Sequence, residues 1–448
     1  MRCLWLALIY LASGPVVAEP LDRFDPVGYW KGAIVKDGSV LSVEVRIERS
    51  AEGLTASTRF PDWLFYEPSG FEKVVRSPDG LTILDLLEGD AKLLLEPRFE
   101  QLIGTVGNDG RTIHLKRSPP PPLEMINQTE LSFESDDGTR LAATLVKPLD
   151  HEPLAGMVIV RGRGCATRVS NTARFFARYG IAVLTYDKRG SGASDGNCAT
   201  FTFDQLTEDA IAALEFLADD PDVDADKVGF FAQSAGAWVI QASAERQRSL
   251  SNAISPAFLI TWIGPATSIV QQQLSSASTY GDAVGLSVAQ QNTLAEVTRI
   301  TVDESLTDDQ AFAKLNAIRR TAEQDGWLDQ GFGADDIPKQ RQDMSRLWLR
   351  RFRYDPTQFL QSLDGLPYLA IFGAQDPIVP LEENVAALRD ADPDVRVVVR
   401  PESGHGYDFD EQDIVLRNGD RFWLFEGPDT GFTVETVRFL RDNGFMKR

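Results

Sequence analysis

Residues 19–118 carry short runs in which apolar and polar side chains alternate. In Leu41–Glu48 every second residue is apolar, which is the period of a strand with one buried face. Shorter runs at Lys92–Leu95 and Thr112–Leu115 are separated by turn signals such as Asn108-Asp109-Gly110. We therefore expect a small all-β domain at residues 19–118, folded as a barrel or a sandwich.

The proline run Pro119–Pro122 ends this region and predicts a stiff linker over residues 119–127. Two strand-like runs then flank the turn Asp136-Asp137-Gly138, as in a β-hairpin. Helical stretches such as Phe203–Leu217 separate the later runs, so residues 128–448 are expected to form a doubly wound, mostly parallel α/β sheet. These later runs are continuously apolar, which is typical of parallel strands with both faces covered: Met157–Val160, Ile181–Tyr186, Val228–Ala232, Phe258–Thr261, Tyr368–Phe372 and Val395–Val399.

One connection between two of these runs, at about residues 265–365, is too long for an irregular loop. Thr307 is followed three residues later by Gln310, which is the capping-box pattern of a helix start. Phe312 and Leu315 then keep the spacing of one helix face. We expect a mainly helical cap above the carboxyl ends of the strands, where sheets of this kind bind ligands.

Residues 1–18 have the organisation of a signal peptide. Arg2 provides the positive charge, and the apolar run Leu4–Leu11 is too short to span a bilayer. Val16-Val17-Ala18 places small residues where a signal peptidase cuts, so cleavage is expected after Ala18. An uncleaved anchor is the alternative, which the short apolar run disfavours. The sequence predicts a secreted or periplasmic protein without a stable membrane span.

The chain of 448 residues contains 66 acidic and 45 basic residues, a net charge of −21. This charge repels a phosphate backbone, so nucleic acid is not expected as a partner. Of the three cysteines, Cys3 lies in the predicted signal peptide, which leaves Cys165 and Cys198. A pair in an oxidising compartment is expected to form a disulfide, and two buried free thiols are the alternative.

Ser234 lies where an apolar strand run meets a helical stretch, in Ala232-Gln233-Ser234-Ala235-Gly236. An α/β-hydrolase places its nucleophile on such a strained strand-to-helix turn, with small residues two positions before and after it. Ala232 and Gly236 meet this size requirement, although the first of these positions is commonly Gly. Ser234 is therefore the candidate nucleophile, and a serine that only caps a helix is the alternative.

A serine nucleophile needs a base, and the base needs an acid that orients it. The chain has three histidines, of which His114 lies in the β-domain and His151 in the loop after the predicted hairpin. His405 follows the last strand run and is flanked by glycines, where this fold places its base. Asp376 follows the preceding strand run and completes the order Ser, Asp, His. The candidate catalytic triad is Ser234, Asp376 and His405.

Acyl transfer also needs backbone N–H groups that face the developing oxyanion. The residue after the nucleophile, Ala235, is expected to supply one of them. The other is expected from the loop Arg161–Cys165, with Arg163 as the first candidate and Gly164 as the second. The side chains of Arg161 and Arg163 have two open roles, which are attraction of an anionic substrate and pairing with acidic surface residues.

Three segments resemble exported bacterial α/β-hydrolases. Tyr186–Ser194 is similar to the loop after the fourth strand in relatives of dienelactone hydrolases and serine aminopeptidases, and we interpret it as a structural turn. Ser234–Trp238 and Gly264–Ser268 are similar to segments of exported esterase-like members that carry an N-terminal β-domain. A departure is Arg161, where many relatives have His. The resemblance implies hydrolysis of carboxylic esters without a metal or an organic cofactor.

Three functions are compatible with these residues. The first is a serine hydrolase that cleaves small or medium carboxylic esters through an acyl-enzyme intermediate. The second is a serine peptidase of the same fold, which needs an acidic cluster for a substrate amine, with Asp308-Asp309 and Asp335-Asp336 as candidates. The third is a binding protein on an inactive hydrolase scaffold, which a complete triad in the right order disfavours.

Overall fold

The structure, a computed structural model, describes residues 24–446 apart from 64–71, 79, 88, 97–99, 122–124, 150–153, 252, 332–336, 364, 393, 410–411, 416–420 and 426. The predicted signal peptide lies outside the described residues, as do His151 and the acidic pair Asp335-Asp336. Two compact units form. One contains the N-terminal strands, and the other contains an eight-stranded sheet with its helices.

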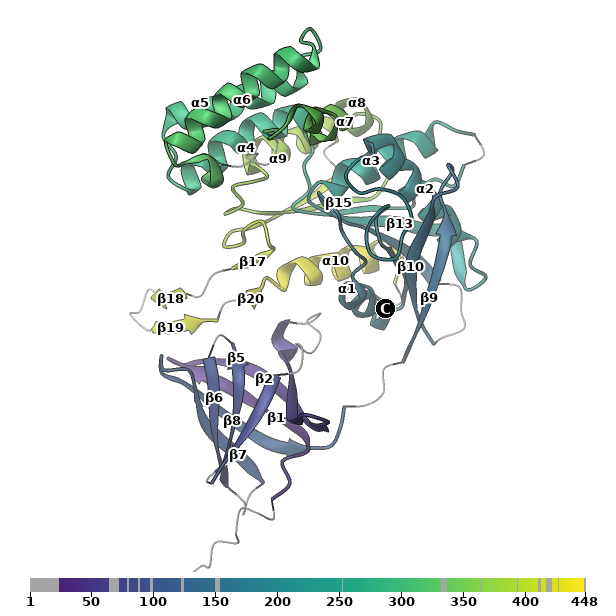
Figure 1. Ribbon diagram of the computed structural model, residues 1–448. Coiled ribbons are helices and arrows are strands. Elements are labelled where there is room, and N and C mark those ends of the chain that lie inside the picture. The colour runs from purple at the N-terminus through teal and green to yellow at the C-terminus, as the bar shows by residue number, and fades with distance from the viewer. Residues whose placement is uncertain are drawn as a thin grey trace, which may run out of the picture. The chain divides into compact units, whose positions relative to one another are not determined.

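The N-terminal unit is a closed antiparallel barrel of eight strands in sequential order (Figure 1). It closes because the first strand pairs with both the second and the eighth. In the second strand the buried residues Val43, Val45 and Ile47 alternate with more exposed ones, so one face of the strand fills the interior. The predicted all-β domain is thus a barrel. Its strands are β1 (Gly28–Lys36), β2 (Ser39–Ser50), β3 (Gly53–Arg59), β4 (Glu72–Ser77), β5 (Gly80–Leu86), β6 (Gly89–Glu96), β7 (Gln101–Val106) and β8 (Arg111–Ser118), and the 3-10 helix η2 (Pro61–Trp63) follows β3.

The second unit is built on a mixed sheet with the strand order β16-β15-β14-β13-β11-β12-β10-β9. β9 and β10, the first two strands of this unit along the chain, form the predicted hairpin, and β10 also pairs antiparallel with β12. All other pairs are parallel, which confirms the predicted mostly parallel sheet. The strands are β9 (Ile126–Glu134), β10 (Arg140–Pro148), β11 (Leu154–Val160), β12 (Ile181–Tyr186), β13 (Val223–Gln233), β14 (Leu259–Trp262), β15 (Tyr368–Gly373) and β16 (Arg396–Arg400).

Helices cover both faces of this sheet (Figure 1). In β11, Met157 and Ile159 belong to one hydrophobic core, whereas Val158 and Val160 belong to the other. The first core is completed by α1 (Ser170–Arg178) and α10 (Gly431–Asp442), and the second by α2 (Phe203–Ala218), α3 (Gly236–Arg248) and α9 (Leu381–Ala391). Because β11 is buried on both sides, its sequence is continuously apolar.

The connection between β14 and β15 is the predicted helical insertion, drawn in green in Figure 1. Thr307 caps its third long helix: Oγ1 of Thr307 accepts from the Gln310 N–H at 3.3 Å, and Oε1 of Gln310 accepts from the Thr307 N–H at 2.9 Å. The insertion has small hydrophobic cores of its own. Its elements are α4 (Ile269–Ala283), α5 (Val288–Val302), α6 (Asp308–Gln324), η4 (Leu328–Gln330), η6 (Arg341–Arg346), α7 (Trp348–Arg351) and α8 (Thr357–Leu360).

An excursion between the last sheet strand and α10 was not expected from the sequence. It contains β17 (Asp408–Phe409), which pairs with β20 (Gly427–Pro428), and β18 (Gln412–Val415), which pairs with β19 (Arg421–Leu424). Strands of two to four residues are too short to give a hydrophobic period. Over the ranges that the structure describes, none of the helices has the length and apolarity to cross a bilayer.

Candidate active site

Ser234 lies on the sharp turn between β13 and α3. Its φ is +49°, in the left-handed region that non-glycine residues rarely adopt, which is the strained backbone expected of a nucleophile elbow. The chain passes so close to the end of β11 that a Cβ at Gly236 would lie 2.7 Å from the carbonyl oxygen of Val160, so this position has no room for a side chain. Ala232 is fully buried before the turn, so the side chain that replaces the usual Gly fits there.

The structure brings the three candidate triad residues together. Oγ of Ser234 lies 3.1 Å from Nε2 of His405, and Nδ1 of His405 lies 2.8 Å from Oδ2 of Asp376. The Asp376 side chain is 1% exposed and that of His405 is 26% exposed. The carboxylate of Asp376 is thus shielded from water, while the imidazole of His405 reaches the surface. With Nδ1 donating to the carboxylate, Nε2 is the nitrogen able to accept the serine proton.

Backbone hydrogen bonds orient the acid. Oδ1 of Asp376 accepts from the N–H groups of Ile378 at 2.8 Å and Val379 at 3.0 Å, so both carboxylate oxygens have partners. Helix α4 of the insertion holds the same turn. Thr279 Oγ1 donates to the carbonyl of Pro377 at 2.6 Å, and residues of α4 also donate to the carbonyl of Ile378. The insertion therefore supports the acid as well as covering the sheet.

The loop that carries the base is tied down by Asp429, which the sequence reasoning missed. This carboxylate is 5% exposed and accepts from Arg400 at 2.8 and 2.9 Å, from the Gly431 N–H at 2.9 Å and from Ser403 Oγ. Burial raises the pKa of Asp429, but the hydrogen bonds from Arg400, Ser403 and Gly431 outweigh it and hold the pKa below its usual range. Because Ser403 lies two residues before His405, Asp429 links the base loop to the start of α10.

The acid and base loops cross without room for a side chain between them. A Cβ at Gly373, the last residue of β15, would lie 2.2 Å from the Ser403 carbonyl oxygen. The Gln375 N–H donates to that same carbonyl at 3.0 Å. The absence of a side chain at Gly373 thus allows His405 to approach Asp376.

The loop Arg161–Cys165 lies against the nucleophile. A Cβ at Gly162 would lie 3.2 Å from both the Gln233 carbonyl oxygen and Cβ of Ser234. On the other side of the serine, Ala235 precedes the first turn of α3, whose N–H groups lack intrahelical acceptors. Within the described residues, the Ala235 N–H donates no hydrogen bond to the protein. It is therefore available to a substrate oxygen.

Lys188 is a second residue near the site that the sequence reasoning missed. Its Nζ donates to the carbonyls of Gly162 at 2.5 Å and Gly164 at 3.3 Å, and the residue is 4% exposed. Burial lowers the pKa of Lys188 to about 7, with a further lowering by the charge of Arg161 and an opposing effect of Asp209. The sequence signal available for the burial of Lys188 was its position two residues after an apolar strand run, because side chains at such positions are rarely exposed.

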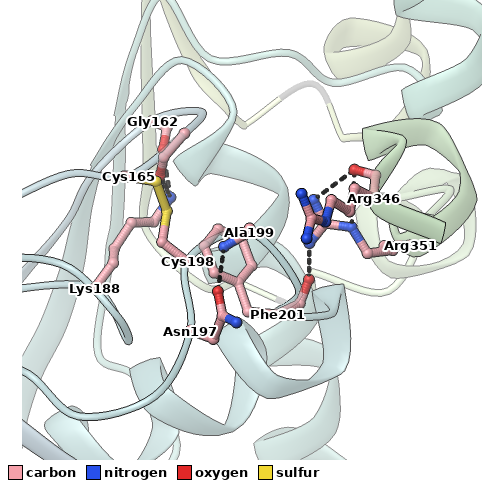
Figure 2. The surroundings of a disulfide bond; sticks show 10 residues. Gly162, Cys165, Lys188, Asn197, Cys198, Ala199, Phe201, Arg346 and Arg351 are labelled. Carbon is pink, nitrogen blue, oxygen red and sulfur yellow. Dashed lines mark hydrogen bonds between the residues drawn. A yellow bond between two sulfur atoms is a disulfide. The ribbon is translucent and has the colours of Figure 1, made fainter. Parts of the chain in front are cut away.

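Cys165 and Cys198 form a disulfide with a Cα–Cα distance of 5.6 Å, and this decides between the two alternatives left open by the sequence. Figure 2 shows the bond beside Lys188 and Gly162. The disulfide joins the end of the Arg161–Cys165 loop to the loop after β12. That loop was interpreted as a structural turn, and its Arg189 is buried in ion pairs with Asp209 and Asp137.

A comparison with protein families shows to which family the chain belongs. Residues 151–412, more than half of the chain, match the family described as serine aminopeptidase, S33. The chain belongs to this family. Its members share the α/β-hydrolase fold that the strand order and the helices on both faces already indicate.

Individual relatives of this S33 family member are distant or partial. The chain is 36% identical over 118 residues to a polyketide transferase of Penicillium crustosum, and the match spans 26% of the chain and only 35% of that relative. It is similar to the solved α/β-hydrolase GrgF from Penicillium sp. sh18, with 16% identity and a TM-score of 0.43 over 71% of this chain and 99% of that one. It is also similar to an esterase of Pyrococcus furiosus, with 15% identity and a TM-score of 0.42 over 72% and 97% of the two chains.

A cavity of about 510 Å³ adjoins the Arg161–Cys165 loop of the S33 domain. This volume is in the range of pockets that hold small organic ligands. Arg163 and Gly164 form part of its wall, together with the disulfide and residues of the insertion such as Trp348. The guanidinium of Arg163 stacks 4.7 Å from the Trp348 ring centre. Residues 163–165 of the candidate oxyanion loop thus line this cavity, whereas Ser234, Asp376 and His405 do not.

The acidic residues considered for a peptidase are engaged in the described part of the insertion. Asp308 pairs with Arg350 at 2.5 Å and with Arg341 at 3.4 Å, and Asp309 pairs with Arg341. His114 is exposed in the barrel, with Nε2 3.1 Å from Oε1 of Gln101. Across the described ranges, His, Cys, Asp and Glu side chains form no group of three or more suited to hold a metal ion.

Proposed function

We propose that this S33 family member is an exported serine hydrolase that cleaves carboxylic esters through an acyl-enzyme intermediate. The observation that carries the proposal is the hydrogen-bonded series Ser234–His405–Asp376 on a strained elbow. Such a series activates a hydroxyl that is otherwise a poor nucleophile. A scaffold that only bound ligands would have no need for this strain and alignment.

In the proposed reaction, His405 accepts the proton of Ser234 as Oγ attacks the ester carbonyl. The N–H groups of Ala235 and Arg163 stabilise the oxyanion of the tetrahedral intermediate. Collapse releases the alcohol, which takes the proton from His405, and leaves the acyl group on Ser234. Water then attacks the acyl-enzyme with His405 again as base. Asp376 holds the imidazole tautomer and stabilises the imidazolium throughout.

The cavity beside the oxyanion loop supports a substrate of small or medium size. Its volume of about 510 Å³ is in the range of pockets that hold small organic ligands, and Arg163 and Gly164 of the candidate oxyanion loop line it, whereas Ser234 and His405 do not. The disulfide supports export, since such bonds persist in oxidising compartments. Export also agrees with the signal peptide expected at residues 1–18.

A peptidase activity is the second candidate, because the family description names serine aminopeptidases. An aminopeptidase must recognise a substrate ammonium group, and Asp308 and Asp309 are already paired with arginines. Purified protein should be assayed with p-nitrophenyl esters and with aminoacyl anilides, beside the Ser234→Ala variant. We expect ester cleavage that requires Ser234. Cleavage of the anilides alone would instead favour the peptidase, and equal ester cleavage by Ser234→Ala would refute both.

A further inference from the structure

Lys188 is a buried cation whose role the proposed reaction does not include. It lies two residues after the end of β12, and its Nζ donates to the carbonyl of Gly162 (Figure 2). The same Nζ donates to the carbonyl of Gly164, so its two acceptors flank Arg163. The Lys188 N–H also donates to the carbonyl of Ala166 at 3.0 Å. One residue therefore holds two carbonyl groups of the candidate oxyanion loop and the carbonyl of the residue that follows the loop.

The contact with Gly162 has a consequence for the amide of Arg163. The Gly162 carbonyl and the Arg163 N–H belong to one peptide group, which is planar, and in the described chain no peptide bond is cis. In a trans peptide the C=O and N–H bonds point in opposite directions. A cation that anchors the oxygen therefore also sets the direction of the N–H.

We propose that Lys188 is the positioning residue of the oxyanion hole, and that its ammonium group orients and polarises the Gly162–Arg163 peptide. This inference rests on the serine hydrolase function proposed above. The ammonium draws electron density toward the Gly162 oxygen, which makes the Arg163 N–H a stronger donor through hydrogen-bond cooperativity. Oriented donors of this kind stabilise the oxyanion without rearranging during the reaction.

The surroundings of Lys188 favour a functional role for its charge over a structural one. Within the described residues, no carboxylate forms an ion pair with Lys188, and the charged groups that act on it are Arg161, which is repulsive, and Asp209, which is attractive. The Phe201 ring centre lies 5.6 Å from Nζ. A buried cation without a paired anion is unfavourable for folding, so residues of this kind are retained where they serve a site.

This environment makes the proposal testable by pH. Because burial lowers the pKa of Lys188 to about 7, the ammonium loses its proton as the pH rises through neutrality. A neutral amine still has two N–H donors, but its charge no longer polarises the peptide. We therefore expect kcat for ester hydrolysis to fall above about pH 7 with the titration of Lys188.

The test uses the mature protein and its Lys188→Met and Lys188→Arg variants, with Lys227→Met as a matched control. Lys227 belongs to the same unit, but its side chain is 47% exposed and pairs with Asp224. The kinetic parameters kcat and KM are measured with p-nitrophenyl acetate from about pH 5 to pH 10, and folding is checked by circular dichroism. Labelling of Ser234 by a fluorophosphonate is measured in parallel.

The expected result for Lys188→Met is a fall in kcat of about 100-fold at neutral pH with KM changed little, as when an oxyanion donor is weakened. The fall of kcat above neutral pH should be absent from Lys188→Arg, whose charge persists, and Lys227→Met should behave as wild type. If Lys188→Met does not fold, the wild-type and Lys188→Arg profiles decide alone. A wild-type protein that labels at Ser234, together with folded Lys188 variants of unchanged kcat and pH profile, would overturn this inference only. An unlabelled wild type would overturn the hydrolase function as well.

Discussion

Oγ of Ser234 and Nε2 of His405 lie 3.1 Å apart although 171 positions separate the two residues in the chain. Each is presented by its own short loop at the end of a sheet strand, so the contact depends on the parallel packing of β13 and β16 within one sheet. On the serine side the close approach of the chain leaves no room for a side chain at Gly236, and on the histidine side Asp429 binds Ser403 of the loop. Substitution of residues that contact these loops therefore tests the site, as does substitution of the triad residues themselves.

Replacement of the base should nearly abolish turnover. His405→Ala removes the group that accepts the Ser234 proton, and we expect kcat/KM for a p-nitrophenyl ester to fall about 10⁴-fold. His114→Ala is the matched control, because His114 is exposed in the barrel. Its kcat/KM should equal that of wild type. Comparable loss in both variants would point to a general effect on folding rather than to the proposed base.

Asp376→Asn should preserve the turn but misorient the base. An amide donates as well as accepts, so it favours the imidazole tautomer in which Nε2 carries the proton. We expect kcat to fall at neutral pH by up to about 10⁴-fold, with KM changed little. The melting temperature should change only slightly, because the contacts to the Ile378 and Val379 N–H groups persist through the amide oxygen. Wild-type kcat in this variant would exclude Asp376 from the triad.

Loss of the disulfide should affect both stability and the oxyanion loop. In the chain-entropy description, a bond across 33 positions stabilises the fold by about 3–4 kcal/mol. The double variant Cys165→Ser/Cys198→Ser should therefore melt at least about 5 °C lower. Because Cys165 ends the candidate oxyanion loop, we also expect kcat to fall more than KM rises. An unchanged melting temperature, measured by circular dichroism, would contradict the stabilising role.

Asp429→Asn should weaken the fold in a pH-dependent manner. The hydrogen bonds from Arg400, Ser403 and Gly431 outweigh burial and lower the pKa of the folded carboxyl, so its contribution to stability is present above the unfolded pKa. That contribution is lost as the pH falls through the folded pKa. We expect Asp429→Asn to lower the free energy of unfolding at neutral pH by about 2 kcal/mol and to reduce the difference from wild type in acid. An equal difference at every pH would show that the carboxylate charge is not involved.

Much of the fold and of the candidate site could be predicted from local patterns. The continuous apolar runs predicted the parallel strands, because burial on both faces leaves no polar positions in a strand such as β11. Ser234, Asp376 and His405 could be selected because each follows a strand of the sheet, β13, β15 and β16 in turn, in the chain order that this fold uses.

The supports of the site could not be found in this way. Lys188 and Asp429 act through carbonyls and side chains that are distant along the sequence, and their spacing to those partners follows no motif. The contact of Thr279 in α4 with the turn after Asp376 depends on how the insertion packs on the sheet. Such contacts follow from tertiary packing, which local periodicity does not encode.

The most direct test of the central claim is the site of reaction with a fluorophosphonate probe. Such probes phosphonylate only an activated serine, and mass spectrometry of the digested protein identifies the modified residue. The proposed function predicts one stoichiometric adduct on Ser234 in the wild-type protein and none in His405→Ala or Ser234→Ala. A wild-type protein that remains unmodified, or that is modified at another serine, would contradict it.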